Sequence, residues 1–325
     1  MEEKTSKRKF GTAFRSMKEA SIIVILIALI IFASIVSPAF LTATNLRTTA
    51  IGFACNGIIA IGMTLALISG GFDLSVGSVL GLSAIVVVKL INSGCNIFLA
   101  CVVGILVGLI CGFINGFLIG YVKLNAFITT LGMQQMARGL VYVLTDGGSV
   151  GLDKKPGVER FRAVGSGSVG VIPTLVIVFL VCAVLGDILV RRSGIARNVF
   201  FVGSNEKTAM LSGINTRKVK TVVYTICGAV SGFAGVLTAS RFGTATSSTG
   251  NGVEMAVISG AVIGGVSLVG GKGTVAGAIL GVVMMSIISN ILVILNVSVH
   301  WQDFITGAIL ILAILFDALS NRKRD

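Results

Sequence analysis

The stretch ISGGFDLSVGSVLG, residues 68–81, places glycines and polar side chains between two long apolar runs. Gly70 and Gly71 disfavour a continuous helix. Asp73 is a candidate N-cap for the helix that follows, and Ser75 can hydrogen-bond backbone groups that a break in the helix would free. Two interpretations are open. The segment lines or gates a path for a polar solute, or it is an ordinary turn that Asp73 caps.

Two other polar residues lie inside apolar runs. Asn115 falls in the middle of a predicted helix among glycines, and Arg138 falls within LGMQQMARGLVYVL. A charged side chain in the bilayer needs a partner or an aqueous cavity, so Arg138 either faces a path or pairs with a buried carbonyl or carboxylate. Arg241 and Glu254 flank the loop FGTATSSTGNGV, and we expect them to pair with each other.

The chain offers no arrangement of residues typical of catalysis. Its one histidine and six scattered cysteines form no metal-ligand spacing, and we interpret the cysteines as helix-packing residues. The stretch GVSLVGGKGT, residues 265–274, departs from the spacing of a phosphate-binding loop. We therefore predict no catalytic residues, no cofactor and no metal, and we assign any ATP hydrolysis to another subunit.

Composition places these residues in a membrane. Of 325 residues, 54% are hydrophobic and 12% are charged, and the mean hydropathy is +0.99. Such a chain is predicted to be an all-α polytopic membrane protein, because a helix satisfies its own backbone groups in lipid. The apolar runs predict ten spans, at about 20–38, 50–69, 74–92, 96–121, 125–144, 169–190, 218–239, 253–269, 274–295 and 302–319.

The basic residues predict the orientation of these spans. The formal net charge is +13, and the lysines and arginines gather at residues 1–19, 191–220 and 320–325. They are not interleaved with aromatic residues, which argues against binding of a nucleic acid. By the positive-inside rule all three segments face the cytoplasm, as an even number of spans requires for the two termini. We predict one transmembrane domain, 20–319, with an external loop at 146–168 and a cytoplasmic segment at 191–217.

Three local patterns refine this organisation. Small residues in VGILVGLICGFINGFLIG, residues 103–120, predict closely packed helices. Within the cytoplasmic segment, Ser204 or Asn205 begins a predicted short helix that ends at Gly213. Residues 69–81 and 263–277 share a double glycine followed by a G[ST]V run, a weak internal repeat. In transporters the substrate site lies between such repeats.

The chain resembles the sugar permeases of bacterial ABC importers of the ribose, arabinose and xylose type. The resemblance covers nearly the whole chain, and the matching stretches are GMTLALISGGFDLSVGSVLGLSA (62–84), NAFITTLGMQQMARGLVYVLTDG (125–147), GSNEKTAMLSGINTRKVKTVVYTICGAVSGFAGVL (203–237) and VEMAVISGAVIGGVSLVGGKGTVAG (253–277). It implies a multi-pass permease of the bacterial inner membrane that forms the path for a monosaccharide such as a ribose-type pentose.

The resemblance also implies partners. These are an ABC ATPase on the cytoplasmic side, an extracytoplasmic sugar-binding protein and a second permease copy, identical or related. Glu206, Ala209 and Gly213 fall on positions of the family's ATPase-coupling element. The alternative is an ion- or proton-coupled carrier of a small neutral solute, in which Asp73 and Arg138 would be the coupling residues. The matched coupling element and the scarcity of buried carboxylates argue against it.

Overall fold

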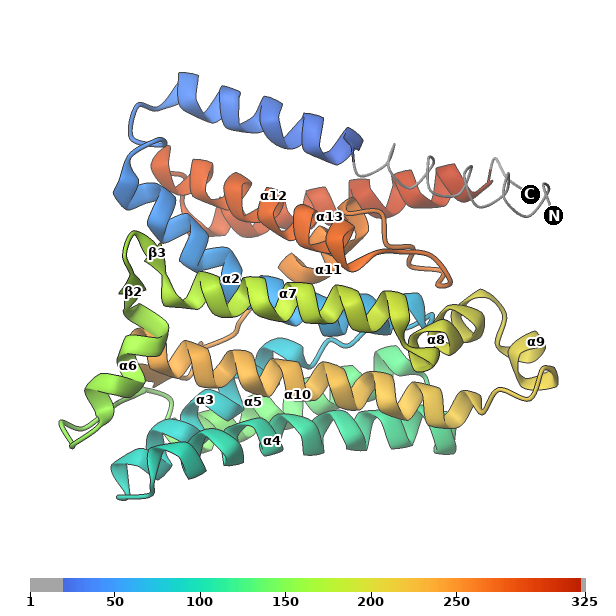
Figure 1. Ribbon diagram of the computed structural model, residues 1–325, viewed down its shortest axis with the longest axis horizontal. Coiled ribbons are helices and arrows are strands. Elements are labelled where there is room, and N and C mark those ends of the chain that lie inside the picture. The colour runs from blue at the N-terminus through green and yellow to red at the C-terminus, as the bar shows by residue number, and fades with distance from the viewer. Residues whose placement is uncertain (1–19, 323–325) are drawn as a thin grey trace.

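A computed structural model of the chain describes residues 20–322. Long helices run back and forth along one axis and form an all-α bundle (Figure 1). The predicted N-terminal tail, 1–19, lies outside the described residues, as do the last three residues of the predicted C-terminal tail, 320–325.

The elements follow one another with short connections. In chain order they are the helix Ala20–Val36, α2 (Ala43–Ile68), α3 (Val76–Asn92), α4 (Ile97–Phe117), the π-helix η1 (Leu118–Val122), α5 (Ala126–Thr145), β1 (Ser149–Gly151), α6 (Val158–Ser166), β2 (Ser168–Val169), β3 (Ile172–Pro173), α7 (Thr174–Arg192), α8 (Gly194–Ser204), α9 (Glu206–Leu211), α10 (Thr216–Phe242), β4 (Thr244–Thr246), α11 (Val253–Ile263), α12 (Val275–Ile294) and α13 (Val299–Arg322). The strands form two small antiparallel pairs, β1 with β4 and β2 with β3.

Each of the ten predicted spans corresponds to a helix, but several ends differ. The span predicted at 253–269 is the short helix α11, which stops at Ile263 because Gly264 and Gly265 follow it, the latter with a φ of +85°. The span predicted from 169 begins at Thr174, because β2 and β3 occupy the preceding residues. Within the predicted loop 146–168 the structure has β1 and α6.

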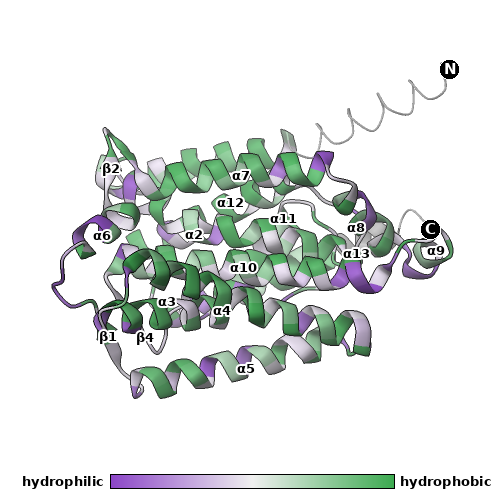
Figure 2. Cartoon of the chain, turned by 60° about the horizontal axis from the view of Figure 1, so that its bottom comes forward, coloured by the Kyte–Doolittle hydropathy of each residue, from purple (hydrophilic) through white to green (hydrophobic). Residues whose placement is uncertain are grey.

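Length and composition mark out the helices that can cross a membrane. Among residues 20–322, five are long and apolar enough, namely α2, α4 with η1, α7, α10 and α12. Shorter apolar helices are Ala20–Val36, α3, α11 and the part Val299–Leu315 of α13. Hydrophilic residues concentrate at the two ends of the bundle, while its length is mostly hydrophobic (Figure 2). This is the pattern of a polytopic membrane protein.

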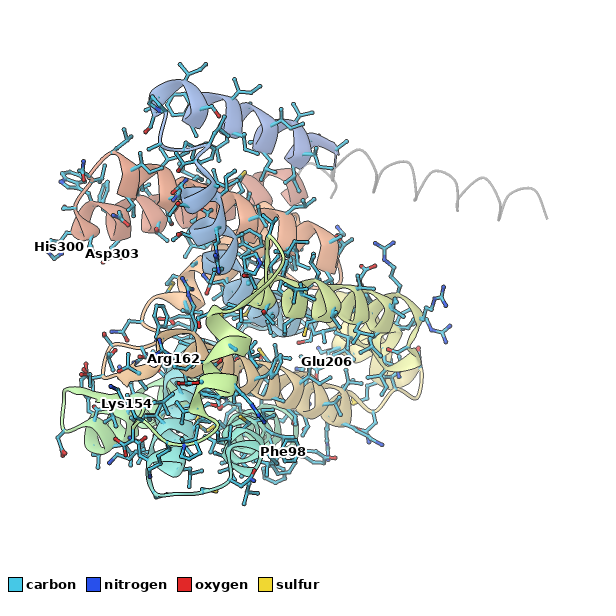
Figure 3. The ribbon with its side chains drawn as sticks, turned by 60° about the vertical axis from the view of Figure 1, so that its left-hand side comes forward. Phe98, Lys154, Arg162, Glu206, His300 and Asp303 are labelled. Atoms are coloured by element: carbon cyan, nitrogen blue, oxygen red, sulfur yellow. The ribbon has the colours of Figure 1, made fainter. Side chains whose placement is uncertain are left out.

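The two ends of the bundle carry different segments. The α6 end carries α6, both strand pairs and the start of α13, and its labelled residues include Lys154, Arg162 and His300 (Figures 1 and 3). The α9 end carries α8, α9, the first turn of the helix Ala20–Val36 and the last turn of α13 (Figure 1). The basic cluster around α8 and α9 therefore shares one end with both terminal helices.

The centre of the bundle is built by α2 and α10, with α4 packed closely along α10. Glycines spaced by four on α4 face α10. A Cβ on Gly108 would lie 2.7 Å from the Cα of Gly232, and one on Gly116 would lie 2.6 Å from the carbonyl oxygen of Thr221. The predicted small-residue contact is confirmed, because any larger residue there would overlap the α10 backbone.

Candidate functional site

The α2–α3 turn breaks the helix where the glycines predict. Gly70 has a φ of +85°, a conformation that glycine adopts without strain. The Oδ1 atom of Asp73 accepts hydrogen bonds from the backbone N of Ser75 (2.9 Å) and from its Oγ (2.6 Å). The prediction that Asp73 is the N-cap of α3 is wrong, because Ser75 occupies that position and Asp73 instead closes a tight turn just before it.

A buried polar cluster surrounds this turn. Asp73 and Ser75 are each 1% exposed, and Asn115 of α4 donates from its Nδ2 to Ser75 Oγ at 3.1 Å. A side chain on Gly71 would overlap the hydroxyl of Tyr224 on α10. Within the described residues, no hydrogen bond of ordinary geometry reaches Asp73 Oδ2, Asn115 Oδ1 or the Tyr224 hydroxyl. The broken segment is thus enclosed by protein and carries unused hydrogen-bonding capacity.

The two halves of the predicted repeat meet at the α9 end of the bundle. The backbone N of Gly271 donates to the carbonyl oxygen of Ile68 at 2.8 Å. Gly203, near the end of α8, lies against both segments, since a Cβ on it would lie 1.7 Å from Ile68 O and 2.7 Å from Gly271 N. Three backbone segments far apart in sequence therefore touch at one point, and only glycine fits at position 203.

Two short helices, α8 and α9, form the segment at this end. Asn205 is the N-cap of α9 and accepts a hydrogen bond from the backbone N of Thr208 at 3.0 Å. After α9, Gly213 has a φ of +82°, and Ile214 N donates back to the carbonyl oxygen of Ala209. The predicted limits of this short helix are confirmed, whereas α8 was not predicted.

The carboxylate of Glu206 ties α9 to the bundle. Its Oε1 lies 3.1 Å from Lys123 Nζ, which follows η1, and its Oε2 lies 2.6 Å from Lys220 Nζ of α10. Partial burial by itself raises the pKa of Glu206, but hydrogen bonds from Lys220 and Lys123, with their charges, outweigh it and lower the pKa below its ordinary value. At neutral pH the side chain is therefore charged and bridges two helices.

The opposite side of α9 faces outward. Leu211 is 87% exposed and Met210 is 59% exposed, while Ala209 is buried against the bundle. These two exposed apolar side chains on a short polar segment make α9 a candidate contact surface.

Arg138 belongs to a second polar cluster. Its Nη1 donates to the carbonyl oxygens of Ser247 (3.0 Å) and Thr249 (2.8 Å), so it pairs with carbonyls of the loop before α11. Glu254 accepts from Gln134 Nε2 at 3.1 Å. This cluster packs against the first turns of α3 rather than joining Asp73, Ser75 and Asn115.

The predicted pair of Arg241 and Glu254 is wrong. Arg241 donates to the carbonyl oxygen of Ile51 and lies 4.6 Å from the ring centroid of Phe242. The chain after α10 folds back between the helices, so that Glu254 lies beside Gly77 of α3, away from the end of α10.

Three residues of the site were not singled out by the sequence. Lys123 and Gly203 act through partners distant in the chain, which no local pattern reveals. Tyr224 is a lone tyrosine within an apolar run, and that isolation is a usable signal.

Comparisons with known proteins identify the architecture. Residues 45–314 match the family model described as "Branched-chain amino acid transport system / permease component". The chain is 37% identical over 293 residues to the ribose import permease protein RbsC of Bacillus subtilis, with 90% of each chain covered. It is 32% identical to RbsC of Escherichia coli K12 over 98% of each chain. To the L-arabinose transport system permease protein AraH of the same strain it is 33% identical, with 95% of this chain and 93% of that protein covered.

No solved structure matches the chain. The family match covers more than half of the sequence, and the relatives align over nearly the full length of both chains. The chain therefore belongs to the permease-component family of bacterial ABC importers, whose members are multi-pass membrane proteins that serve as the non-catalytic transport subunit.

Proposed function

We propose that this chain forms the path of a ribose-type pentose through the membrane in an importer driven by ATP. A separate ABC ATPase docks at the α9 end, and an extracytoplasmic sugar-binding protein delivers the sugar at the α6 end. The observation that supports this proposal most is the arrangement of α9. Its Leu211 and Met210 side chains are exposed, and its Glu206 carboxylate forms ion pairs with two lysines of the bundle.

The orientation follows from charge. The basic residues of the segment 191–220 lie at the α9 end, together with the ends of both terminal helices (Figure 1). Lysine and arginine are enriched on cytoplasmic loops, so the α9 end faces the cytoplasm and both termini lie there. The α6 end then faces outward, and the inner membrane of a bacterium is the location.

The coupling residues act as a rigid lever. Glu206 links α9 to η1 and α10, Ala209 packs α9 against the bundle, and Gly213 allows the chain to turn sharply into α10. The contact of Gly203 with Ile68 and Gly271 passes displacement of α8 and α9 to both halves of the repeat. Motion of the ATPase is thereby converted into movement of two glycine turns, the α2–α3 turn at Gly70 and Gly71 and the turn at Gly270 and Gly271.

The face of α5 is the surface on which a second permease copy packs. Gly132, Gln135 and Gly139 share one face, Gln135 is exposed, and a Cβ on either glycine would meet no atom within 4 Å. Hydrophilic bands interrupt α5 at the edge of the bundle (Figure 2). An amide in hydrocarbon needs a partner, and small residues allow a close helix contact. The copy is identical or a related permease.

The predicted path residues take two roles in this arrangement. Arg138 lies on the same helix as Gln135. With its Nη1 held by the carbonyl oxygens of Ser247 and Thr249, its remaining guanidinium donors line the path between the copies, where they and the Gln135 amide suit the hydroxyls of a neutral sugar. The turn with Gly70, Gly71 and Asp73, together with Ser75 and Asn115, forms a gate. Asp73 Oδ2 and Asn115 Oδ1 have no hydrogen-bond partner in the described arrangement, so they are free to pair with new donors when α8 moves the turn.

The substrate class rests on the relatives. Their printed names specify ribose and L-arabinose, and identities of 32–37% leave the choice between pentoses to experiment. Scarcity of charge inside the bundle fits a neutral solute.

Uptake of labelled sugar by intact cells tests the proposal. Cells expressing the permease with its ATPase and binding protein should accumulate labelled D-ribose or L-arabinose in an ATP-dependent manner. Deleting 204–213, or introducing Gly213→Val, should abolish uptake while the chain stays inserted, because valine is strained at a φ of +82°. Sugar uptake that is indifferent to ATP would instead support a secondary carrier.

A further inference from the structure

A groove of about 470 Å³ runs along the outside of the bundle between α7 and α10, with α2 as its floor. These helices run side by side, and α8 lies across their α9 end (Figure 1). Leu185, Ile226 and Phe233 are among the side chains of its walls. Apart from Cys182 and Ser193, every lining residue is aliphatic, aromatic or glycine. The groove therefore suits a hydrocarbon occupant.

Its length and position fit one leaflet of a bilayer. The α10 wall runs from Val222 to Phe233, which at a rise of 1.5 Å per residue is roughly 16 Å. Half of a hydrocarbon core of about 30 Å is about 15 Å. Because α10 begins at Thr216 at the α9 end, the groove lies in the leaflet on that side.

Positive charge gathers where the groove ends, at the junction of α7 and α8. Arg192 and Arg197 are both exposed there, and Arg197 Nη2 lies 3.9 Å from the Cβ position of Gly194, the first residue of α8. At the start of α8, Ser193 Oγ accepts a hydrogen bond from Ala196 N at 3.0 Å, whereas the amides of Gly194 and Ile195 have no acceptor within the helix and favour an anion. Asp187 on this stretch of α7 already forms an ion pair, since its Oδ2 lies 2.6 Å from Nε of Arg191.

We propose that this groove holds an acyl chain of an anionic phospholipid, whose headgroup phosphate is bound by Arg192, Arg197 and the start of α8. Basic pockets between membrane helices on the cytoplasmic side bind such headgroups. Assigning the site to the cytoplasmic leaflet rests on the orientation proposed above. The bound lipid would join the bundle to α8, the helix that carries Gly203.

A second permease copy fits this groove less well than a lipid. Bulky aliphatic walls gain little from a protein helix over a lipid chain, whereas close helix contacts in membranes use small and polar residues. Those features lie on α5, at Gly132, Gln135 and Gly139.

Native mass spectrometry of the purified full-length chain tests the site. The probes are palmitoyl-oleoyl phosphatidylglycerol and the corresponding phosphatidylcholine, titrated in detergent. Phosphatidylglycerol should bind about thirtyfold more tightly, the factor that two arginines contribute at a charged membrane surface. The double variant R192A/R197A should lose this preference, and Ala229→Trp, which fills the groove, should weaken both lipids. Arg160→Ala, at the α6 end, is the matched control.

Equal binding of the two lipids, an unchanged preference in R192A/R197A, or wild-type binding by a folded Ala229→Trp variant would each overturn the proposal. If Ala229→Trp does not fold, tryptophan fluorescence gives a second measurement. The variant Ile226→Trp, combined with Trp301→Phe, carries its one tryptophan at the groove. Brominated phosphatidylglycerol should quench it, and R192A/R197A should reduce the quenching. Lipid binding is measured without transport, so failure here leaves the proposed function standing, and failure of ATP-driven uptake leaves this result unaffected.

Discussion

Replacing Gly203 with alanine perturbs the contact between α8 and the two glycine turns. The new Cβ would lie 1.7 Å from the carbonyl oxygen of Ile68, whereas ordinary contact begins at 3.4 Å, so α8 and the α2–α3 turn must separate by about 1.7 Å. Overpacking of this kind costs about 1–3 kcal/mol. Loss of the hydrogen bond from Gly271 N to Ile68 O adds about 0.5–1.5 kcal/mol, and the better helix propensity of alanine returns about 1 kcal/mol.

The net cost destabilises the arrangement in which Gly203 of α8 contacts Ile68 and Gly271. A bias of about 0.5–3.5 kcal/mol shifts a two-state equilibrium about 2–300-fold. We expect ATP-driven sugar uptake in proteoliposomes containing the ATPase and binding protein to fall by a factor in that range, while the ATPase still copurifies. Gly194→Ala is the matched control in the same helix, because its nearest heavy atom is the flexible end of Arg197 at 3.9 Å. Wild-type uptake by Gly203→Ala would refute this route of coupling.

Glu206→Gln should lower uptake severalfold but change the free energy of unfolding by less than about 1 kcal/mol, as exposed ion pairs do. Because the pKa of Glu206 is lowered, its contribution to stability is complete above its ordinary pKa of 4.5 and disappears as pH falls through the lowered value, so thermal unfolding of wild type and variant should converge in acid. A pH-independent difference would contradict this. Gly112→Ala should destabilise the bundle by about 1–3 kcal/mol, since the new methyl overlaps the α10 backbone, whereas Gly139→Ala should not; equal melting temperatures would count against the described α4–α10 contact. Asp73→Ala removes the acceptor for Ser75 and should cost about 1–3 kcal/mol, while Asp73→Asn keeps an acceptor oxygen and should remain close to wild type in a denaturation experiment.

Much of the fold could be predicted, because a membrane helix requires a long apolar run, which is visible in the sequence. The limits of α9 were predictable for the same kind of local reason, from an N-cap at Asn205 and a glycine at 213. The position of Asp73 in a broken segment was also predictable, but its exact hydrogen bonds were not, because they depend on where α3 begins.

The missed features are contacts between distant segments. The bridge from Glu206 to Lys123 and Lys220, and the partners of Glu254, are set by the way the helices pack. Local sequence patterns carry no information about such pairs. Helix α8 was missed since GIARNVFFVGS is short and lies within a basic stretch that reads as a loop.

The proposed function requires that α9 lies in the cytoplasm and contacts the ATPase. In a chain whose six native cysteines are replaced, Leu211→Cys and Val171→Cys place one thiol at each end, at positions 87% and 93% exposed. The measurement is labelling by a membrane-impermeant maleimide in sealed vesicles of both orientations, followed by cross-linking to the ATPase. We expect the Leu211→Cys thiol to react only from the cytoplasmic face and to cross-link to the ATPase, and the Val171→Cys thiol to react only from outside. Labelling of the Leu211→Cys variant from the outer face, or no cross-link from an accessible thiol, would contradict the proposed docking of the ATPase on α9.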